Sequence, residues 1–425
     1  MSGAGAEFAG SIATEGRKLL FVSLLPFVPE SRGGADLTHL CLFRSLERRE
    51  WRVQVLCGTM LHSRYGQRLC REWASATAAL RRAPTFIADD DSGFPAWRGL
   101  PSGWSPLGFA YGEALALAAK LRLRPGGSQR GRGLRANACG QGLQGMRGKL
   151  DELLDSFRPD LLLGHYGVMP LLDHASLRGF PCFYYSHGTQ MRTRKIPPTV
   201  YAIVNSPAAM PEDDRGVRLL PPMIDPADYR VVRDDPRFVT FVNPVREKGA
   251  DIAIEMARRL PHIPFLFVEG GWARRGKASD MRRWVARARR LPNVTVWKFQ
   301  SDMRAVYRVT DVLLMPSRYE SFGRVVIEAH HSGIPVVAAR VGGIPFAMGQ
   351  GGLLVDPSEG VAGYVRALEQ LEREPGLKQN LARLAQENSR RPEFDPETQV
   401  EEFLRFVVPR LAGKRARENG KDARA

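Results

Sequence analysis

Two glutamates eight positions apart stand where a predicted buried strand meets a predicted helix. Glu320 lies in the loop after the apolar run 311–316, and Glu328 lies one to two turns into the helix that follows. A carboxylate beside an apolar helix entry costs desolvation energy unless hydrogen-bond donors satisfy it, and the hydroxyl groups of a diol are such donors. The alternative is that one glutamate only stabilises the helix N-terminus, where an acidic residue is favoured.

A lysine occupies a comparable position after another apolar run. Lys248 and Gly249 lie between the run 238–243 and a helical pattern over 250–260. A lysine that enters a helix N-terminus at the carboxyl end of a parallel strand is well placed to pair with a phosphate. On position alone, an ordinary solvated lysine is an equal alternative.

A pair of glycines marks a third candidate site near the start of the chain. Gly33 and Gly34 follow the apolar run 19–25 and precede a helical pattern. A strand, a glycine-rich turn and a helix N-terminus together favour anion binding, because the backbone can approach the ligand and the first helical N–H groups point at it. The spacing is not G-x-G-x-x-G, so no dinucleotide fingerprint is present, and a plain turn is the alternative reading.

The elements that must position these residues form an alternating α/β pattern. Short apolar runs alternate with helical patterns along the whole chain, which predicts parallel sheets with helices on both faces. The predicted strands of the first half are 19–25, 53–57, 85–88, 160–164, 181–186 and 201–205. Those of the second half are 238–243, 264–269, 293–299, 311–316, 334–338 and 353–356.

The chain length of 425 residues exceeds one ordinary hydrophobic core and predicts two domains. A segment rich in proline and charge, 205–235, is expected to form the irregular connection between them. The predicted organisation is a first domain over 1–228 with a Gly/Arg-rich insertion at about 122–147, a second domain over 229–395, a helix over 396–412 that packs back on the first domain, and a flexible tail over 413–425.

The composition is that of a globular protein, with 44% apolar and 25% charged residues. No apolar run is long enough to span a bilayer. The five cysteines are scattered and form no C-x-x-C pair, which predicts neither a zinc site nor a disulfide framework and favours the cytoplasm.

The net charge of +17 and the basic run 274–290 raise the hypothesis of nucleic-acid binding. No nucleic-acid-binding signature accompanies this charge, so the hypothesis is disfavoured. A role in holding anionic diphosphates, or a peripheral contact with anionic membrane lipids, accounts better for the charge.

Taken together, these sites resemble those of the retaining, GT-B-fold glycosyltransferases of family 4, the group 1 glycosyltransferases. The resemblance extends in order from about residue 17 to residue 410. The residues that carry it are Gly33-Gly34, Arg158-Pro159-Asp160, Asn205-Ser206, Pro222-Met223-Ile224-Asp225, Lys248-Gly249, and Glu320 and Glu328 between Pro316-Ser317 and Gly333-Ile334-Pro335-Val336.

The resemblance implies two Rossmann-like doubly wound domains facing a central cleft and a metal-independent transfer of a sugar from a nucleotide-sugar donor to a saccharide, lipid or small-molecule acceptor. It implies catalytic roles for Glu320, Lys248 and His187, without a cofactor. Asp89-Asp90-Asp91 is accordingly expected to be a surface loop rather than a metal site. The expected donor-binding residues are Gly33, Gly34, Asn243, Arg246, Ser321, Phe322, Gly323, Arg324 and Glu328.

Two positions depart from the family pattern, and both are expected near the donor. Asn243 stands where many members carry arginine, with Arg246 or Arg324 as the hypothetical replacement, and Phe346 stands where glutamate is frequent. Two alternatives therefore stay open besides an ordinary transferase. One is a coupling enzyme of the same fold that uses an amine or cyclitol acceptor, and the other is a non-catalytic nucleotide-sugar sensor.

Overall fold

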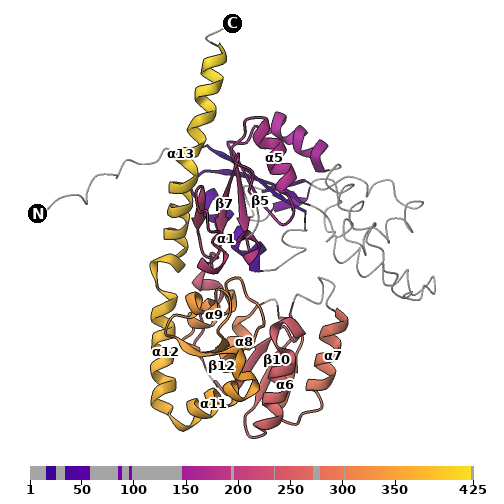
Figure 1. Cartoon of the computed structure of the whole chain (residues 1–425), viewed down its shortest axis with the longest axis vertical. Helices are drawn as coiled ribbons and strands as arrows, with labels where there is room; N and C mark the ends of the chain where they lie inside the picture. Colours follow the sequence, from indigo (N-terminus) through magenta and orange to yellow (C-terminus); the bar gives the residue numbers. More distant parts are fainter. Residues whose placement is uncertain are drawn as a thin grey trace, which may run out of the picture.

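The computed structural model describes residues 16–24, 34–57, 85–88, 95–97, 146–192, 196–233, 235–270, 278–300 and 302–422. These residues form two stacked α/β units, and a long C-terminal helix lies along one side (Figure 1). Gly33, the run Asp89-Asp90-Asp91 and most of the segment 122–147 lie outside the described residues.

The first unit is built on an eight-stranded sheet with the spatial order β4-β3-β2-β1-β5-β6-β7-β8. Strands β2, β1, β5, β6, β7 and β8 are parallel, and β3 and β4 extend the sheet in antiparallel fashion. The bounds are β1 (Lys18–Ser23), β2 (Arg52–Cys57), β3 (Thr85–Ala88), β4 (Pro95–Trp97), β5 (Leu161–His165), β6 (Cys182–Ser186), β7 (Val200–Val204) and β8 (Val217–Leu219).

The second unit is built on a six-stranded parallel sheet with the order β11-β10-β9-β12-β13-β14. Its strands are β9 (Phe238–Val242), β10 (Phe265–Val268), β11 (Val294–Trp297), β12 (Thr310–Met315), β13 (Val336–Ala339) and β14 (Gly352–Val355). This order is that of a Rossmann sheet. The predicted α/β class with two Rossmann-like domains is therefore confirmed.

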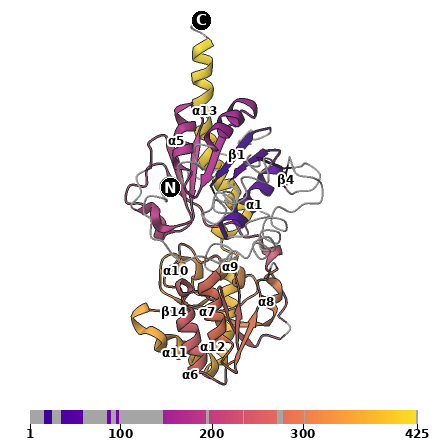
Figure 2. The same cartoon turned by 90° about the vertical axis from the view of Figure 1, so that its right-hand side faces the viewer.

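Helices cover both faces of both sheets. They are α1 (Gly34–Glu47), α5 (Met169–Leu177), α6 (Ala250–Arg259), α7 (Ala278–Ala288), α8 (Arg304–Val309), α9 (Arg324–His330), α10 (Ile344–Met348), α11 (Gly360–Arg373), α12 (Pro375–Ser389) and α13 (Pro396–Asp422). A further helical segment spans 146–156. Figure 2 shows α9 and α10 on the side of the second unit that faces the first.

The burial of β1 shows why its sequence is continuously apolar. Leu19 and Phe21 belong to one buried cluster, whereas Leu20 and Val22 belong to another. Successive side chains of a strand point to opposite faces, so both faces of this sheet are covered.

Each sheet has one topological switch point, where the strand order reverses. It lies between β1 and β5 in the first sheet and between β9 and β12 in the second. In open α/β sheets, ligands bind outside the carboxyl ends of the strands at such a point. The loops after β9 and β12 carry Lys248 and Glu320, which the sequence singled out.

Two features of the first sheet differ from the expectation. Strand β8 pairs in parallel with β7, although it lies inside the segment 205–235 that was expected to be irregular. It is a three-residue edge strand without a buried side chain, so it leaves little apolar signal in the sequence. Strands β3 and β4 are antiparallel, whereas the alternating pattern predicted parallel pairing.

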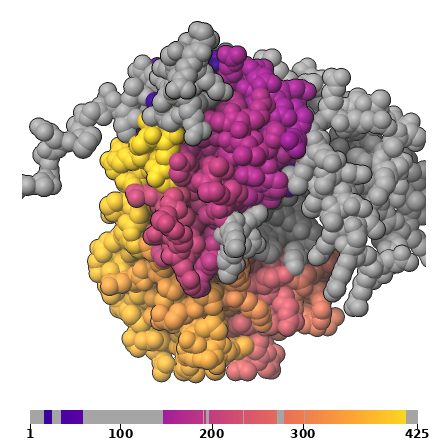
Figure 3. Space-filling view, turned by 45° about the horizontal axis from the view of Figure 1, so that its top comes forward, coloured from indigo at the N-terminus to yellow at the C-terminus, as the bar shows by residue number. Residues whose placement is uncertain are grey.

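The C-terminal helix α13 is longer than predicted and extends to Asp422. Lysine, arginine and glutamate, which are favourable in helices, dominate the segment 413–422 that was expected to be a tail. The first part of α13 packs on the first unit, where Phe403 and Val407 share a buried cluster with Leu19. Figure 3 shows the first part of this helix in yellow beside the magenta first unit.

Among the described residues, no helix is both long enough and apolar enough to cross a membrane.

Candidate functional site

The loops that follow β9 and β12 bring a lysine and a glutamate together. Lys248 ends the short 3-10 helix η7 (Arg246–Lys248), and its ammonium donates a hydrogen bond to the Glu320 carboxylate. The Ser317 hydroxyl donates to the same carboxylate oxygen at 3.1 Å. The side chains of Lys248 and Glu320 are only 17% and 11% exposed. An anion that reaches Lys248 would compete with Glu320 and free this carboxylate to accept hydroxyl groups.

Gly249 allows these two loops to approach each other. Its φ of +83° is left-handed, and a Cβ at this position would lie 2.1 Å from the carbonyl oxygen of Pro316. Arg318 ties the loops together from the outside. It donates to both carboxylate oxygens of Asp251, at 2.8 and 2.6 Å, and to the carbonyl of Arg246 at 2.7 Å.

Replacing Gly249 by alanine is expected to cost at least about 2 kcal/mol of stability, because a left-handed alanine is strained and its methyl group meets the backbone of Pro316. Chemical denaturation measures this loss. Gly179→Ala is the matched control, since Gly179 has a similar φ of +88° but no atom lies within 4 Å of its virtual Cβ. Equal losses in the two variants would contradict the close approach of the loops.

Glu328 lies on α9 with both carboxylate oxygens bound by protein donors. Arg324 Nε donates to one oxygen at 2.7 Å, and the Tyr307 hydroxyl donates to the other at 2.8 Å. The carboxylate of Glu328 is buried, and each of its oxygens still has a lone pair available for a further hydroxyl donor. Arg324 and Tyr307 therefore fix the orientation of the Glu328 carboxylate.

Arg324 connects the two units. Its Nη1 donates to Thr38 Oγ1 at 3.0 Å and to the Met223 carbonyl at 2.8 Å, and its Nη2 donates to the Tyr229 hydroxyl at 3.1 Å. Burial by itself would lower the pKa of Arg324, but Tyr229 and Glu328 outweigh it and the net shift is upward. The guanidinium therefore remains charged.

The N-terminus of α1 meets Arg324 across the junction. A Cβ on Gly34 would lie 3.1 Å from Arg324 Cδ, and Thr38 donates to the Gly34 carbonyl at 2.8 Å. The structure thus places Gly34 next to the helix that carries Glu328. The carboxyl ends of the two sheets face each other, because Asn205 after β7 donates to Ser321 after β12 at 3.2 Å.

The segment from Ser321 to Gly323 is held by a second pair of glycines. Virtual Cβ atoms on Gly342 and Gly343 would lie 1.7 Å from the Glu320 carbonyl oxygen and 2.2 Å from the Ser321 carbonyl oxygen. Only glycine fits such contacts. Gly323 itself has a φ of +92° and begins α9.

The two departures from the family pattern have structural explanations. Asn243 has a φ of +62°, a left-handed conformation that asparagine adopts more readily than arginine, and its side chain packs on Gly270. Phe346 packs edge-on against Phe322 and Phe394, at centroid distances of 6.3 and 5.7 Å. Phe346 therefore belongs to an aromatic cluster. Of the two arginines expected to replace the one missing at position 243, Arg246 is exposed and lies two residues from Lys248.

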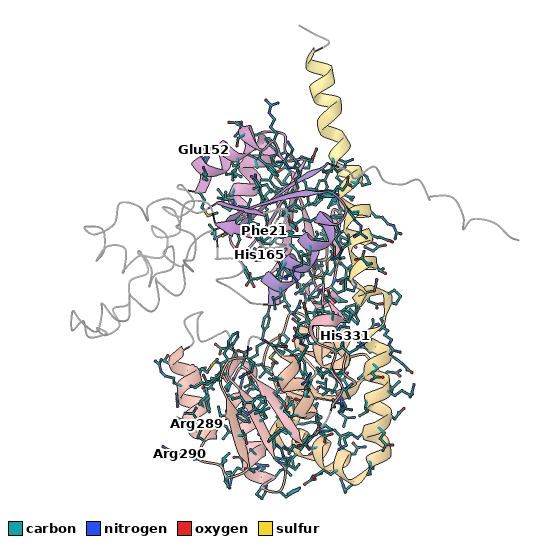
Figure 4. The ribbon with its side chains drawn as sticks, turned by 180° about the vertical axis from the view of Figure 1, so that it is seen from behind. Phe21, Glu152, His165, Arg289, Arg290 and His331 are labelled. Carbon is teal, nitrogen blue, oxygen red and sulfur yellow. The ribbon has the colours of Figure 1, made fainter. Side chains whose placement is uncertain are left out.

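His187 follows β6 and lies in a cluster with two histidines that the sequence analysis did not single out. One ring nitrogen from each of His39, His165 and His187 lies within 4.8 Å of the others, a geometry that could hold a metal ion. Figure 4 shows His165 beside Phe21 at the end of the first sheet that faces the second unit. Burial lowers the pKa of His39 to about 3, so its ring is neutral. The sequence signal for His165 was its position directly after the predicted strand 160–164; in the structure it is the last residue of β5.

Buried neutral histidines predict that the protein loses stability in acid. Burial lowers the pKa of His39 and His330 from 6.5 to about 3. His330 is held neutral by Asn388, which donates to its Nδ1 at 3.0 Å, while Nε2 lies 3.2 Å from the Gly351 carbonyl. Below about pH 6.5 the unfolded chain binds these protons and the native chain does not, so stability falls as the pH falls.

Each of these histidines is expected to remove about 2 kcal/mol of stability between pH 8 and pH 5. Urea denaturation at the two pH values measures the loss, and His330→Gln should reduce it. A stability that is equal at both pH values would contradict the prediction.

Comparison with known proteins identifies the segment that holds most of this site. Residues 228–389 match the family model of the Glycosyl transferases group 1. A D-inositol 3-phosphate glycosyltransferase of Segniliparus rotundus is 37% identical over 167 residues, which is 34% of this chain and 36% of that relative. The match thus spans only about a third of the length of this curated relative.

Solved structures resemble the whole described chain. Sucrose-phosphate synthase of Thermosynechococcus elongatus has a TM-score of 0.66 at 18% identity, with 93% of this chain and 99% of that chain covered. HepE of Anabaena, solved with UDP and glucose, has a TM-score of 0.58 at 16% identity, with 92% and 100% covered. These similarities confirm the GT-B architecture of two Rossmann-like domains.

Proposed function

We propose that this chain is a glycosyltransferase that moves a sugar from a nucleotide-sugar donor to a hydroxyl group of an acceptor. The observation that carries the proposal is the ion pair between Lys248 and Glu320 at the reversal point of the second sheet. A cation for the diphosphate and a carboxylate for the sugar hydroxyls are thereby adjacent, inside the segment that matches a glycosyltransferase family.

Lys248 supplies the electrostatic part of the reaction. The bond between the anomeric carbon and the donor phosphate breaks, and negative charge grows on the departing nucleoside diphosphate. An ammonium placed where this charge develops stabilises the transition state. Arg246, which is exposed beside it, and the backbone at Gly34 are proposed to assist in binding the diphosphate.

The two glutamates orient the donor. Glu320 accepts hydrogen bonds from the transferred sugar once its lysine partner turns to the diphosphate, with Ser321, Phe322 and Gly323 offering backbone groups. Glu328 accepts the ribose hydroxyls while Arg324 and Tyr307 hold it in place. Asn243 lines the same loop, and His187 after β6 contacts the sugar from the first unit.

The transfer is proposed to proceed with retention of the anomeric configuration. The acceptor oxygen attacks from the face that the phosphate leaves, a new bond forms to the anomeric carbon, and the acceptor proton passes to the leaving phosphate oxygen. In this scheme the protein needs no pair of general acid and base carboxylates. Proton NMR of the first product formed gives the configuration.

The reaction is proposed to need no metal ion, because Lys248 provides the positive charge at the diphosphate. Dialysis against EDTA is expected to leave the initial rate unchanged, as measured by release of the nucleoside diphosphate. If EDTA lowers the rate and added zinc restores it, the proposal is contradicted. If zinc then fails to restore the rate of His165→Ala, the three-histidine cluster has a catalytic role.

The acceptor class proposed first for testing is a phosphorylated cyclitol. The reason is that matched relatives carry the name D-inositol 3-phosphate glycosyltransferase, although the match covers only about a third of the relative named above. A saccharide or a lipid-linked glycan is the broader alternative. Incubation with UDP-, GDP-, dTDP- and ADP-sugars and each acceptor, followed by mass spectrometry, distinguishes them.

Each product class has its own meaning. A glycosylated hydroxyl supports the proposal, and an amine-linked product would instead establish a coupling enzyme of the same fold. Donor binding without transfer to any acceptor would indicate a non-catalytic nucleotide-sugar sensor. If the chain neither binds a donor nor transfers a sugar, the proposal is wrong.

A peripheral contact with anionic lipids is a further part of the proposal. Arg282, Arg283 and Arg287 on α7, and Arg289 and Arg290 just after it, are exposed. Figure 4 places Arg289 and Arg290 at the outer edge of the second unit, away from His165. Co-sedimentation with phosphatidylglycerol vesicles tests the contact, and equal sedimentation of a variant with these arginines replaced would contradict it.

A further inference from the structure

A separate pocket of about 390 Å³ lies beside the connections between the two units. Its lining residues are Arg230, Val231, Val232, His331, Gln386, Ser389 and Arg390. None of them belongs to the candidate site described above. Figure 4 shows His331 near the level where the two units meet, close to the C-terminal helices.

Both passages of the chain between the units border this pocket. Arg230, Val231 and Val232 belong to the segment between β8 and β9, by which the chain enters the second unit. Ser389 ends α12, and Arg390 follows it just before the chain returns to the first unit through α13. The wall between them is tied to α9 and its C-terminal cap, since the Val231 N–H donates to Ser332 Oγ at 3.0 Å and Ser332 Oγ donates to the Tyr229 carbonyl at 3.1 Å.

The charges of the pocket are all of one sign. Arg230 and Arg390 are exposed, and neither forms an ion pair with a described residue. No acidic residue is among those that line the pocket. An uncompensated pair of guanidinium groups in a concave site attracts anions, and phosphate is the anion whose geometry the arginine side chain matches well.

His331 is a buried polar residue of the pocket wall. It is 4% exposed at the pocket wall, and its pKa is lowered to about 4. Burial is the main cause, and the positive charges of Arg230 and Arg324 add to it, opposed by Asp225. The ring is therefore neutral near pH 7 and adds polarity without a charge.

We propose that this pocket binds a phosphate group through Arg230 and Arg390, and that the bound group links the two chain passages between the units. Gln386 is the neutral polar side chain next to them on the exposed face of α12. The pocket volume suits a small phosphorylated molecule rather than a bare ion alone. A ligand held by both passages stabilises the arrangement of the two units.

Isothermal titration and thermal melting of the full chain with inorganic phosphate and with inositol phosphate test this site at constant ionic strength. Arg230→Ala and Arg390→Ala are each expected to weaken binding at least about tenfold, because each removes a charge-assisted contact. Arg383→Ala is the control on α12, the helix that precedes Arg390, since Arg383 pairs with Glu387 and lies outside the pocket. It should bind as the unaltered chain does.

Lys248→Ala separates this pocket from the candidate donor site. Phosphate binding that survives Lys248→Ala but is lost in the Arg230 and Arg390 variants supports the pocket, whether or not the protein transfers sugars. Binding that is lost in Lys248→Ala and kept in both arginine variants would overturn the proposal.

A second experiment uses vesicles containing phosphatidylinositol phosphate. Binding of vesicles alone, with the same arginine dependence, identifies a lipid headgroup as the source of the phosphate, and no binding in either experiment overturns the site.

Discussion

Replacing Lys248 by alanine is expected to lower kcat/KM by about 10²–10³-fold, the usual effect of removing one group that stabilises transition-state charge. The side chain of Lys248 is only 17% exposed and pairs with Glu320, so no water-exposed cation can easily take its place. Most of the loss should fall on kcat, because charge on the diphosphate develops in the transition state. Steady-state assay of nucleoside diphosphate release measures it.

Two further variants show whether the charge itself matters. Lys248→Arg keeps the charge and should retain more activity than Lys248→Ala, whereas Lys248→Met should behave like alanine. Arg259→Ala is the surface control, because Arg259 pairs with Glu255 at the end of the helix that follows Lys248 and does not reach Glu320. Unchanged kcat/KM in Lys248→Ala would contradict the proposed role.

Replacing Glu328 by alanine is expected to affect both donor binding and folding. The change removes the carboxylate that is proposed to bind ribose, and it leaves the Arg324 guanidinium buried without its partner. Breaking a buried ion pair by removing one member typically costs about 3–5 kcal/mol. Donor affinity should fall at least about tenfold, because a hydrogen bond to a charged group is lost.

The chain provides a matched control for the stability effect. Arg383 and Glu387 form an ion pair of the same spacing on α12, but their side chains are 58% and 54% exposed. Glu387→Ala should therefore cost no more than about 0.5 kcal/mol. Glu328→Gln keeps the shape and an acceptor oxygen for Arg324, so it should lose less stability than Glu328→Ala. Equal stability of the two alanine variants would contradict the burial of the Arg324–Glu328 pair.

Most strands of the two sheets could be predicted because a sheet covered on both faces needs continuous apolar runs, whereas the three-residue strands β4 and β8 were not predicted. The run 238–243 became β9 and the run 311–316 became β12, each within one residue at either end. Because β9 and β12 are parallel neighbours, the loops that carry Lys248 and Glu320 both follow the carboxyl ends of these strands. The candidate site could therefore be predicted from the positions of the two loops.

The remaining parts depend on contacts that leave no local signal. Arg324 was expected near the donor, and its bonds to Thr38 and Met223 depend on how the two units pack. The short edge strand β8 has no buried residue that could reveal it. His39 and His165 are brought to His187 from two other elements, and isolated histidines in a sequence are usually ordinary buried or surface residues.

Phe346 shows what the sequence could not reveal about a departure from the family pattern, namely the residues that surround it. Its position after Gly342-Gly343 suggested an altered donor contact. In the structure its ring packs with Phe322 and Phe394, and the Arg391 guanidinium lies 5.2 Å from its centroid. The substitution of an acidic residue by an aromatic one is thus explained by packing within the second unit.

The most direct test of the account is thermal melting of the unaltered chain and of Glu328→Gln with UDP-, GDP-, dTDP- and ADP-sugars. A ligand at one hundred times its dissociation constant adds about 2.7 kcal/mol of stability, which is readily visible as a rise in melting temperature. We expect donors of one nucleotide to raise the melting temperature of the unaltered chain, and to stabilise Glu328→Gln by about half as much or less at the same concentration, since a tenfold weaker affinity leaves about 1.4 kcal/mol. If no nucleotide sugar raises it, or if the variant responds equally, the donor site assigned to Lys248, Glu320 and Glu328 is wrong.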